Sequence, residues 1–342
     1  MTELESHDLT YGSDKAGLVW GYVLSAAGPC RSISAEEALN VLAPEDRGGG
    51  NLFLWLHFSL ANASAERWMR QHLSLPEAFY QSFQQGLGST RVEQDDDALI
   101  AVIHDVLLSS DFEASDASTV SLCVRPRLLV SARPRPLRSI DRLRASVKAG
   151  EHFRSTAELL AHLLREQAGV LLEIVRRSTT HVDSVEDKLL ASRIAVSRTE
   201  LGSLRRVLVR LQRLLAPEPA ALFRLLNRPP AWLTEDDVLD LRQAAEEFNT
   251  TVADSAALGE RIRLLQEELA ALISEQNNKI LFVLTVVTVL ALPFNIIGGL
   301  FGMNVGGIPF AGDRHGFATI IAFVALGTGI AAYLIMQRRG RQ

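Results

Sequence analysis

The C-terminal part of the chain contains two long apolar runs. Residues 280–301 carry no charged side chain over 22 positions, and residues 317–336 carry none over 20. An α-helix rises about 1.5 Å per residue, so each run is long enough to cross the ~30 Å hydrocarbon core of a bilayer. We therefore predict two transmembrane helices, at 280–301 and 317–336, joined by an outer loop at 302–316.

The first apolar run carries a stripe of polar and small residues. Its members recur at alternating steps of three and four, which places them on one face of a helix. The stripe comprises Asn278, Leu281, Thr285, Thr288, Leu292, Asn295, Gly299 and Gly302. A polar stripe in a membrane helix faces water, an ion or another helix. It therefore indicates either a pore lining or close helix packing, since Gly, Thr and Asn also favour such contacts.

The N-terminal part shows the pattern of a mixed α/β domain. Short apolar segments bounded by Gly, Pro or Asn predict strands at 17–24 and 52–58, and two or three more within 98–108 and 120–131. Helices are predicted at 34–42 and 64–73, each starting with a serine cap. We assign residues 1–155 to a cytoplasmic α/β domain.

From residue 156 the pattern becomes helical. Helices at 156–194 and 199–215 predict an antiparallel hairpin, which with its proline-rich connector occupies 156–233. Thr234 is a good N-cap, and no helix breaker follows before Pro293. One continuous helix is therefore predicted from Glu235 to about Phe301, with a cytoplasmic stalk at 234–279. The predicted fold is an α+β cytoplasmic domain, a mixed sheet with helices, that leads through very long stalk helices into a two-helix transmembrane hairpin.

Flanking charges predict the orientation in the membrane. Lys279 precedes the first span and a basic tail at 337–342 follows the second, whereas the loop between them carries only Asp313 and Arg314 as charged residues. The positive-inside tendency places both termini in the cytoplasm. The first fifteen residues are polar and acidic, with no apolar core of a signal peptide. We expect a multi-pass protein of a bacterial inner (plasma) membrane.

Charge is distributed unequally between the helical segments. Residues 235–275 contain eleven acids and three arginines, whereas residues 193–213 contain six arginines and one acid. One interpretation is that the two segments complement each other within a subunit or between subunits. The other is that a symmetric assembly forms an acidic cytoplasmic vestibule that concentrates cations. Glu260 and Glu267 continue the stripe into the stalk and are the candidates for this role.

The sequence gives little support to other kinds of chemistry. Cys30 and Cys123 lie far apart and lack metal-ligand spacing. We find no nucleophile–base arrangement, phosphate-binding loop or paired catalytic carboxylates, so neither an enzyme nor a bound cofactor is predicted. The basic segments 125–127 and 133–138 form one proline-punctuated run in an acidic chain with a pI near 5.9. It favours a solvated loop or a partner within the chain, and not nucleic acid.

The end of the first span resembles a known family. Gly302, Met303 and Asn304 close this span shortly before a second and final one, as in the CorA-type, or two-span GxN, metal-ion transporters. The following Asn-Val-Gly-Gly-Ile-Pro segment, residues 304–309, is similar to the zinc-transporting ZntB branch. Magnesium-type members usually carry an aromatic and an acidic residue in this loop. The resemblance implies a homopentameric funnel in which the first span of each subunit lines the axis.

Such a ring would repeat each stripe residue five times. Two spans per chain cannot enclose an aqueous path, so transport requires oligomers. Asn304 would form a ring of amide oxygens at the outer mouth, beside Gly302 and Met303, and would hold a divalent ion through its hydration water. The remaining pore-lining candidates are Asn295 as a second amide ring, Thr288 and Thr285 as hydroxyl rings, Leu292 and Leu281 as apolar constrictions, Gly299 as a point of close approach, and Asn278 at the cytoplasmic start.

The resemblance implies transported Zn2+, with Mg2+, Co2+, Ni2+ or Cd2+ as alternatives. Zinc prefers His and Cys ligands, which the stripe lacks, so the zinc assignment depends on the resemblance alone. Proton coupling has been proposed for this branch, but the membrane stripe has no titratable group. Asp313 and His315 in the outer loop are the candidates for attracting ions or coupling protons. The expected partners are copies of the same chain, the lipid bilayer and divalent cations, without nucleic acid.

A second functional class stays open at this point. The two spans would then only anchor a coiled coil that acts as a scaffold or sensor. This hypothesis predicts that Asn295 and Asn304 tolerate replacement by Leu or Ala without functional loss.

Overall fold

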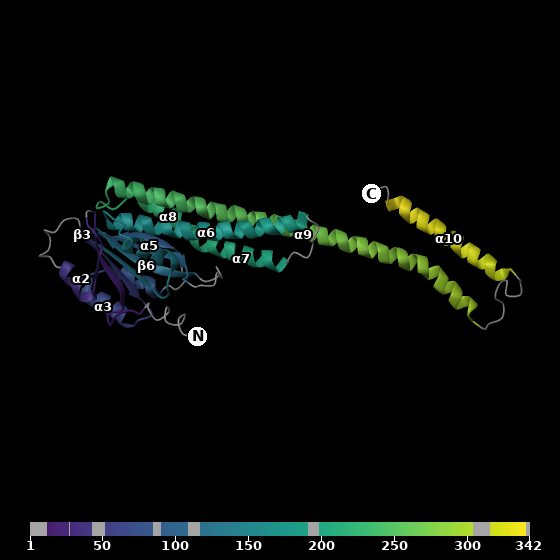
Figure 1. The fold of residues 1–342 in the computed structure, drawn as a ribbon, viewed down its shortest axis with the longest axis horizontal. Coiled ribbons are helices and arrows are strands. Elements are labelled where there is room, and N and C mark those ends of the chain that lie inside the picture. The colour runs from purple at the N-terminus through teal and green to yellow at the C-terminus, as the bar shows by residue number, and fades with distance from the viewer. Residues whose placement is uncertain are drawn as a thin grey trace. The chain divides into compact units, whose positions relative to one another are not determined.

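The computed structural model describes residues 12–26, 28–42, 52–84, 90–108, 117–190, 198–303 and 315–339. The chain divides into two compact units, residues 1–265 and 266–342 (Figure 1). The first unit holds a sheet with helices on both faces and a bundle of helices. The second unit holds the end of helix α9 (Glu235–Phe301) and helix α10 (Gly316–Arg339).

A seven-stranded sheet forms the centre of the first unit, in the order β2-β1-β3-β7-β6-β5-β4. Every neighbouring pair is antiparallel except β3 and β7, which are parallel. The strands are β1 (Leu18–Ser25), β2 (Arg31–Ile33), β3 (Leu52–Ser59), β4 (Arg91–Asp95), β5 (Ala98–Val106), β6 (Ala117–Arg125) and β7 (Leu128–Arg133). Strands β5 and β7 are buried at every position, as expected for a sheet covered on both faces.

Two hydrophobic cores separate along the alternation of each strand. In β3, Phe53 and Trp55 belong to one core, whereas Leu54, Leu56 and Phe58 belong to the other, because successive side chains point to opposite faces. The first core is closed by α5 (Arg138–Lys148), α6 (Thr156–Leu190), α8 (Pro217–Leu226) and the first turns of α9. The second is closed by α2 (Ala35–Leu42), α3 (Ser64–His72), α4 (Glu77–Gln81) and the adjoining η3 (Ser82–Gln84).

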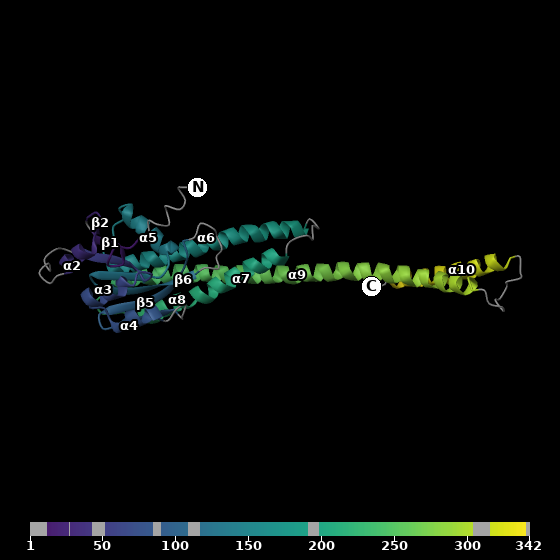
Figure 2. The same ribbon diagram turned by 90° about the horizontal axis from the view of Figure 1, so that it is seen from below.

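A three-helix bundle extends from the first core. Helices α6, α7 (Arg198–Leu215) and the first part of α9 share a buried cluster that includes Ile174, Leu208, Leu211, Phe248 and Ile262. Figures 1 and 2 both show α7 beside α6 in the first unit. The predicted helices at 156–194 and 199–215 are thus confirmed over their described residues, and residues 191–197 lie outside them.

The helix starts show which cap predictions were correct. Ser34 and Glu37 form a capping box: the Ser34 hydroxyl accepts from the Glu37 N–H at 3.2 Å, and the Glu37 carboxylate accepts from the Ser34 N–H at 2.8 Å. The predicted cap at Ser64 is wrong. Ser64 is already helical, and its N–H donates to the Asn62 side chain at 2.9 Å. An Asx turn two residues earlier thus satisfies this N–H group.

Helix α9 is a single helix of 67 residues, from Glu235 to Phe301 as predicted. It begins with a second reciprocal cap, in which the Thr234 hydroxyl accepts from the Asp237 N–H at 3.1 Å and the Asp237 carboxylate accepts from the Thr234 N–H at 3.1 Å. Pro293 lies inside the helix. Because proline has no N–H group, the carbonyl of Val289 loses its helical donor at this point.

Candidate functional site

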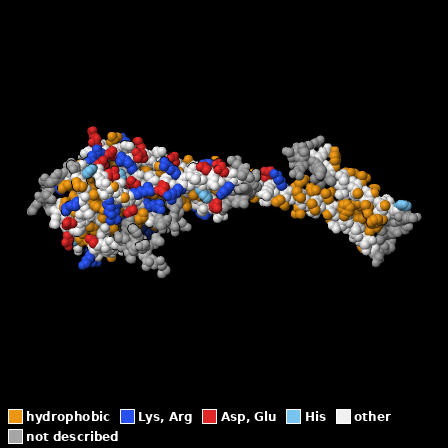
Figure 3. Space-filling view, viewed as in Figure 1, with side chains coloured by type: hydrophobic (Ala, Val, Ile, Leu, Met, Phe, Trp, Pro, Cys, Tyr) orange, Lys and Arg blue, Asp and Glu red, His pale blue; other side chains and the backbone are white. Residues whose placement is uncertain are grey.

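The C-terminal part of α9 exposes an apolar surface. Among the described residues, α9 is the one helix long and apolar enough to cross a membrane, with a mean hydropathy of 2.6 over its most apolar 18-residue window and no buried residue there. Helix α10 contains a shorter apolar stretch, Gly316–Ile330. Figure 3 shows hydrophobic side chains gathered over this region. An apolar surface this extensive requires lipid or protein contacts to cover it.

The predicted stripe lies on this surface as one continuous helical face. All seven members within the helix are exposed: Asn278, Leu281, Thr285, Thr288, Leu292, Asn295 and Gly299. Gly302 and Met303 follow in the turn after the helix and are also exposed. Asn304 and Asp313 lie outside the described residues.

Helix α10 faces the opposite side of α9. Two apolar pockets are lined by Pro293, Phe294, Ile297, Gly298 and Phe301 of α9, together with residues of α10 that include Phe317, Ile320 and Val324. At about 100° per residue, these α9 positions lie across the helix from the stripe. In the described part of the chain, the stripe therefore takes no part in packing against α10. Packing against α10 thus does not account for the stripe, and its assignment to a pore lining stays a prediction.

The threonines of the stripe present acceptor oxygens. The Thr285 hydroxyl donates to the Leu281 carbonyl, and the Thr288 hydroxyl donates to the Leu284 carbonyl, both at 2.8 Å. Since each hydroxyl hydrogen is directed to the helix backbone, the oxygen lone pairs are left for other partners. Acceptor oxygens on an otherwise apolar surface suit a hydrated cation, whose water molecules donate hydrogen bonds.

One of the apolar pockets between α9 and α10 contains two polar groups that lack a partner. Thr328 of α10 lines the same pocket as Val289 and Pro293, and its buried hydroxyl has no hydrogen-bond partner. The Val289 carbonyl lacks its helical donor because of Pro293. A polar group without a partner is costly in an apolar environment, so this pocket is a weak point in the packing of α9 against α10.

The charged candidates are exposed but not grouped. Glu260 accepts hydrogen bonds from the Arg263 guanidinium, with Nε at 2.9 and 3.0 Å from its two oxygens, and this contact lowers the pKa of Glu260. Glu267 is exposed three turns before the apolar part of the helix. The carbonyl of exposed His315 accepts from the Thr319 N–H at 3.1 Å at the start of α10. No three His, Cys, Asp or Glu side chains form a metal-binding group among the described residues.

A buried polar network that the sequence analysis missed joins the sheet to the helices. Glu218, at the start of α8, is fully buried and accepts from the His104 N–H at 2.6 Å and from the Gln167 amide at 3.1 Å. His104 lies beyond the residues of β5 that pair with β4, so Glu218 satisfies a donor at the sheet edge. Burial raises the pKa of Glu218. The only sequence signal was an acid placed between Pro217 and Pro219.

A neighbouring carboxyl group fixes the start of α5. Asp105 is buried and accepts from the Val106 N–H at 2.7 Å and from the Ser139 N–H at 2.9 Å. Its second oxygen also accepts from the Ser139 hydroxyl. Burial raises the pKa of Asp105 to about 6, although these hydrogen bonds lower it.

The basic segment 133–138 finds partners within the chain. The buried Arg133 guanidinium donates to His57 Nε2 at 2.7 Å, and Arg138 donates to the Leu107 carbonyl at 3.1 Å. Burial and the nearby arginines hold the pKa of His57 well below its usual value, so neutral His57 can accept this bond. The intramolecular alternative for this segment is confirmed.

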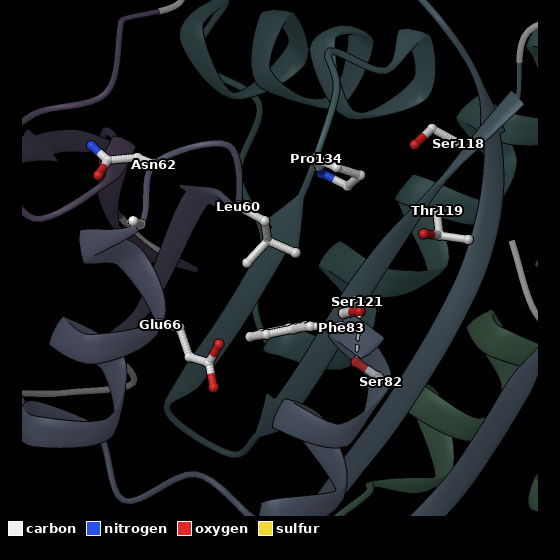
Figure 4. Close-up of a pocket in the computed structure, with 10 residues that line it drawn as sticks. Leu60, Asn62, Glu66, Ser82, Phe83, Ser118, Thr119, Ser121 and Pro134 are labelled. Carbon is white, nitrogen blue, oxygen red and sulfur yellow. Dashed lines mark hydrogen bonds between the residues drawn. The ribbon is translucent and has the colours of Figure 1, made fainter. Parts of the chain in front are cut away.

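The first unit also contains a polar pocket of about 580 Å3 at the carboxyl ends of β3 and β7 (Figure 4). Hydroxyl groups of Ser82, Ser118, Thr119 and Ser121 line it, and Ser82 and Ser121 are joined by a hydrogen bond of 2.7 Å. Glu66 is the one acid among its described lining residues, and it already accepts from Arg70 at 2.9 Å. This set of groups does not resemble a divalent-metal site.

Comparison with known families identifies the chain. The family described as "CorA-like Mg2+ transporter protein" matches residues 50–339. The chain belongs to this family. It is a family of transporters, so the prediction that this protein is not an enzyme is confirmed, as is the resemblance to the CorA-type family.

Two relatives can be aligned with this chain over almost its full length. The divalent cation transporter CmaX of Pseudomonas aeruginosa is 28% identical over 310 residues, which are 89% of this chain and 91% of the relative. The zinc transport protein ZntB of Yersinia enterocolitica is 24% identical over 317 residues, which are 92% of this chain and 94% of the relative. The relatives therefore differ in the ion that their names specify.

Solved structures confirm the coarse fold of the CorA-like chain. The structure of the full-length CmaX protein matches with a TM-score of 0.81 and 26% identity, over 95% of this chain and 99% of that one. The CorA magnesium transporter from Methanocaldococcus jannaschii matches with a TM-score of 0.73 and 20% identity, over 92% and 96%, which shows the fold alone. The predicted mixed α/β domain followed by a long C-terminal helix is confirmed.

Proposed function

We propose that this protein transports divalent metal ions across a bacterial inner membrane, through a pore lined by the stripe of α9. The observation that supports this most strongly is that the stripe is exposed on the side of α9 opposite to α10. A face that carries amide and hydroxyl oxygens needs a polar partner in a membrane. An axial path filled with hydrated ions is such a partner.

The pore is formed by several copies of the chain. Two helices cannot surround an aqueous path, so neighbouring subunits must complete it. We propose a homopentamer in which the α9 helices surround the axis, the α10 helices face the lipid, and both termini are cytoplasmic. The 302–316 loop then forms the outer mouth, where five Asn304 side chains contact the hydration shell of the ion.

Zinc is the proposed cargo, on the basis of the segment 304–309 and the similarity to a zinc transport protein. The similarity to a divalent cation transporter keeps Mg2+, Co2+, Ni2+ and Cd2+ as alternatives. A stripe of neutral oxygens binds ions through water and discriminates weakly between them. Selectivity therefore depends on the outer loop, where Asp313 and His315 are the ionisable candidates.

Metal flux into proteoliposomes tests this function. Vesicles loaded with a zinc-sensitive dye should take up Zn2+ with the wild type and not with Asn304→Ala or Asn295→Leu. Ile297→Ala, on the face toward α10, is the matched control and should retain flux. Mg2+ uptake is measured in parallel, each with and without an inward proton gradient.

The outcomes separate the hypotheses. Flux of Mg2+ without Zn2+ would move the protein to the magnesium-type alternative. Dependence on the proton gradient would indicate coupled transport. Absence of flux for every ion, with oligomers intact in the membrane, would reject the pore and favour a membrane-anchored scaffold or sensor.

A further inference from the structure

Helix α7 exposes an arginine face for which the structure shows no partner in the same chain. Arg206, Arg210 and Arg213 recur at steps of four and three on the exposed side of α7, around Val209, which is 49% exposed. Within the described part of the chain, none of these three arginines makes an ion pair, whereas Arg261 and Arg263 of the same bundle do. We call this surface the α7 arginine face.

Helix α9 exposes a complementary surface in the same bundle. Glu246, Glu247 and Asp254 are exposed, and exposed Ala253 and Ala257 lie between and beyond them at helical spacing. No ion pair involves these three acids in the described residues. Small side chains at the centre allow another helix to approach closely, and the acids border that contact. We call this surface the α9 acidic face.

The two surfaces border the same buried cluster of the bundle. Leu208 and Leu211 of α7 belong to the same buried cluster as Phe248 and Val252 of α9, so the inner sides of both stretches face one core. Their exposed sides therefore face away from this core. Within the described residues of one subunit, no ion pair joins an arginine of the α7 arginine face to an acid of the α9 acidic face.

We propose that the α7 arginine face of one subunit docks on the α9 acidic face of the next. Two different surfaces of one protomer make a heterologous contact, which closes into a ring when repeated by rotation. Val209 then packs on Ala253 and Ala257, with the charged groups around them. This inference rests on the self-association in the proposed function and names its cytoplasmic interface.

Charge reversal tests the contact in the full-length protein in detergent, with the oligomer mass measured by light scattering after size exclusion. Reversal of the arginine face (R206E, R210E and R213E together) should raise the dissociated fraction about tenfold, since several pairs are lost at each interface. Reversal of the acidic face (E246K, E247K and D254K together) should do the same. Arg176→Glu, an exposed arginine of α6 outside both faces, is the control and should leave the mass unchanged.

Combining both reversals in one chain is the decisive experiment. Opposite charges then face each other again, and the oligomer should be restored to near the wild-type share. Wild-type oligomers should also dissociate more in 1 M than in 0.1 M salt, because exposed ion pairs are screened. Unchanged mass in both single-face variants, or no recovery in the combined variant, would overturn the interface. Binding of the wild type to anionic vesicles that the R206E, R210E and R213E variant loses, with oligomer mass unchanged, would instead assign the arginine face to lipid headgroups.

Flux measurements distinguish this inference from the proposed function. If the mass responds as expected but no ion is transported by the wild type, the interface stands and the transport function fails. If the wild type transports ions but charge reversal leaves its mass unchanged, transport stands and the interface fails.

Discussion

Two buried carboxyl groups, Asp105 and Glu218, accept backbone N–H groups where the helices meet the sheet. Each provides an acceptor for N–H groups that would otherwise have no partner, at the cost of burying an ionisable group. Because burial raises the pKa of both groups, their contribution to stability depends on pH. The four tryptophans all lie in the first unit, so their fluorescence reports on its unfolding.

Asp105 should make the first unit less stable as the pH rises. Its pKa is about 6 in the folded protein against 3.8 in its ordinary state, so its favourable contribution is complete below pH 4 and is lost as the pH rises through 6. The expected loss is about 3 kcal/mol. Asp105→Asn should weaken the dependence of the melting temperature on pH between pH 4.5 and 7, as measured by tryptophan fluorescence. The exposed Asp187→Asn is the control, and an equal slope in both variants would contradict the assignment.

Glu218 should be more important for stability than an ordinary helix residue. Glu218→Ala leaves the His104 N–H and the Gln167 amide without an acceptor, which should cost about 2–4 kcal/mol. Glu218→Gln keeps one acceptor oxygen and should cost less. The melting temperature by tryptophan fluorescence measures both, and an equal loss in the two variants would show that the hydrogen bonds are not the cause.

At the level of elements, the two faces of α9 have different properties because α10 covers only one of them. Local periodicity was sufficient to place both faces, since a continuous helix repeats every 3.6 residues. It could not show which face meets α10. The apolar pockets that Pro293, Ile297 and Gly298 share with α10 supplied that information.

Leu292 and Leu290 provide a matched test of the two faces. Leu292 belongs to the exposed stripe as a predicted apolar constriction, whereas Leu290 lies on the side toward α10. Leu292→Ser should raise ion flux in proteoliposomes several-fold, because a hydroxyl makes the constriction easier to hydrate. Leu290→Ser should leave flux near the wild-type value. The opposite ranking would contradict the assignment of the stripe to the pore.

Replacement of Thr328 by an apolar residue should not reduce stability. Thr328→Val removes a buried hydroxyl that has no partner and keeps nearly the same shape, so the melting temperature should stay equal or rise. Thr319→Val is the control. It removes a hydroxyl that has a partner, since this hydroxyl donates to the His315 carbonyl at 3.1 Å. A loss of stability in Thr328→Val alone would show that the hydroxyl has a partner in the membrane.

At the level of the whole molecule, a shared pore predicts that subunits act together. If wild-type and Asn304→Ala chains are mixed equally before assembly, and one altered subunit is enough to block a pentamer, flux should fall to roughly 3%. Separate pathways in each subunit would leave about half. Flux into proteoliposomes from co-expressed, differently tagged chains measures this. Homogeneous pentamers mixed after assembly are the control.

The sequence by itself determined the elements whose cause is local. The helix from Glu235 to Phe301, the N-caps at Ser34 and Thr234, and the spacing of the stripe from Asn278 to Gly302 follow from side-chain periodicity and neighbouring residues, and the structure contains them. The motif at 302–304 also indicated the family before any comparison. The role of Asn304 stays a prediction, because it lies outside the described residues.

Only the tertiary structure decided which distant residues meet. His104 and Glu218 are 114 positions apart, and Arg133 and His57 are 76 apart, so no local pattern announces these contacts. The same holds for the polar pocket beside β3 and β7, the outward faces of α7 and α9, and the side of α9 that meets α10. Local periodicity assigns a residue to a face of its own element. Packing between elements, driven by burial of apolar surface, decides what that face contacts.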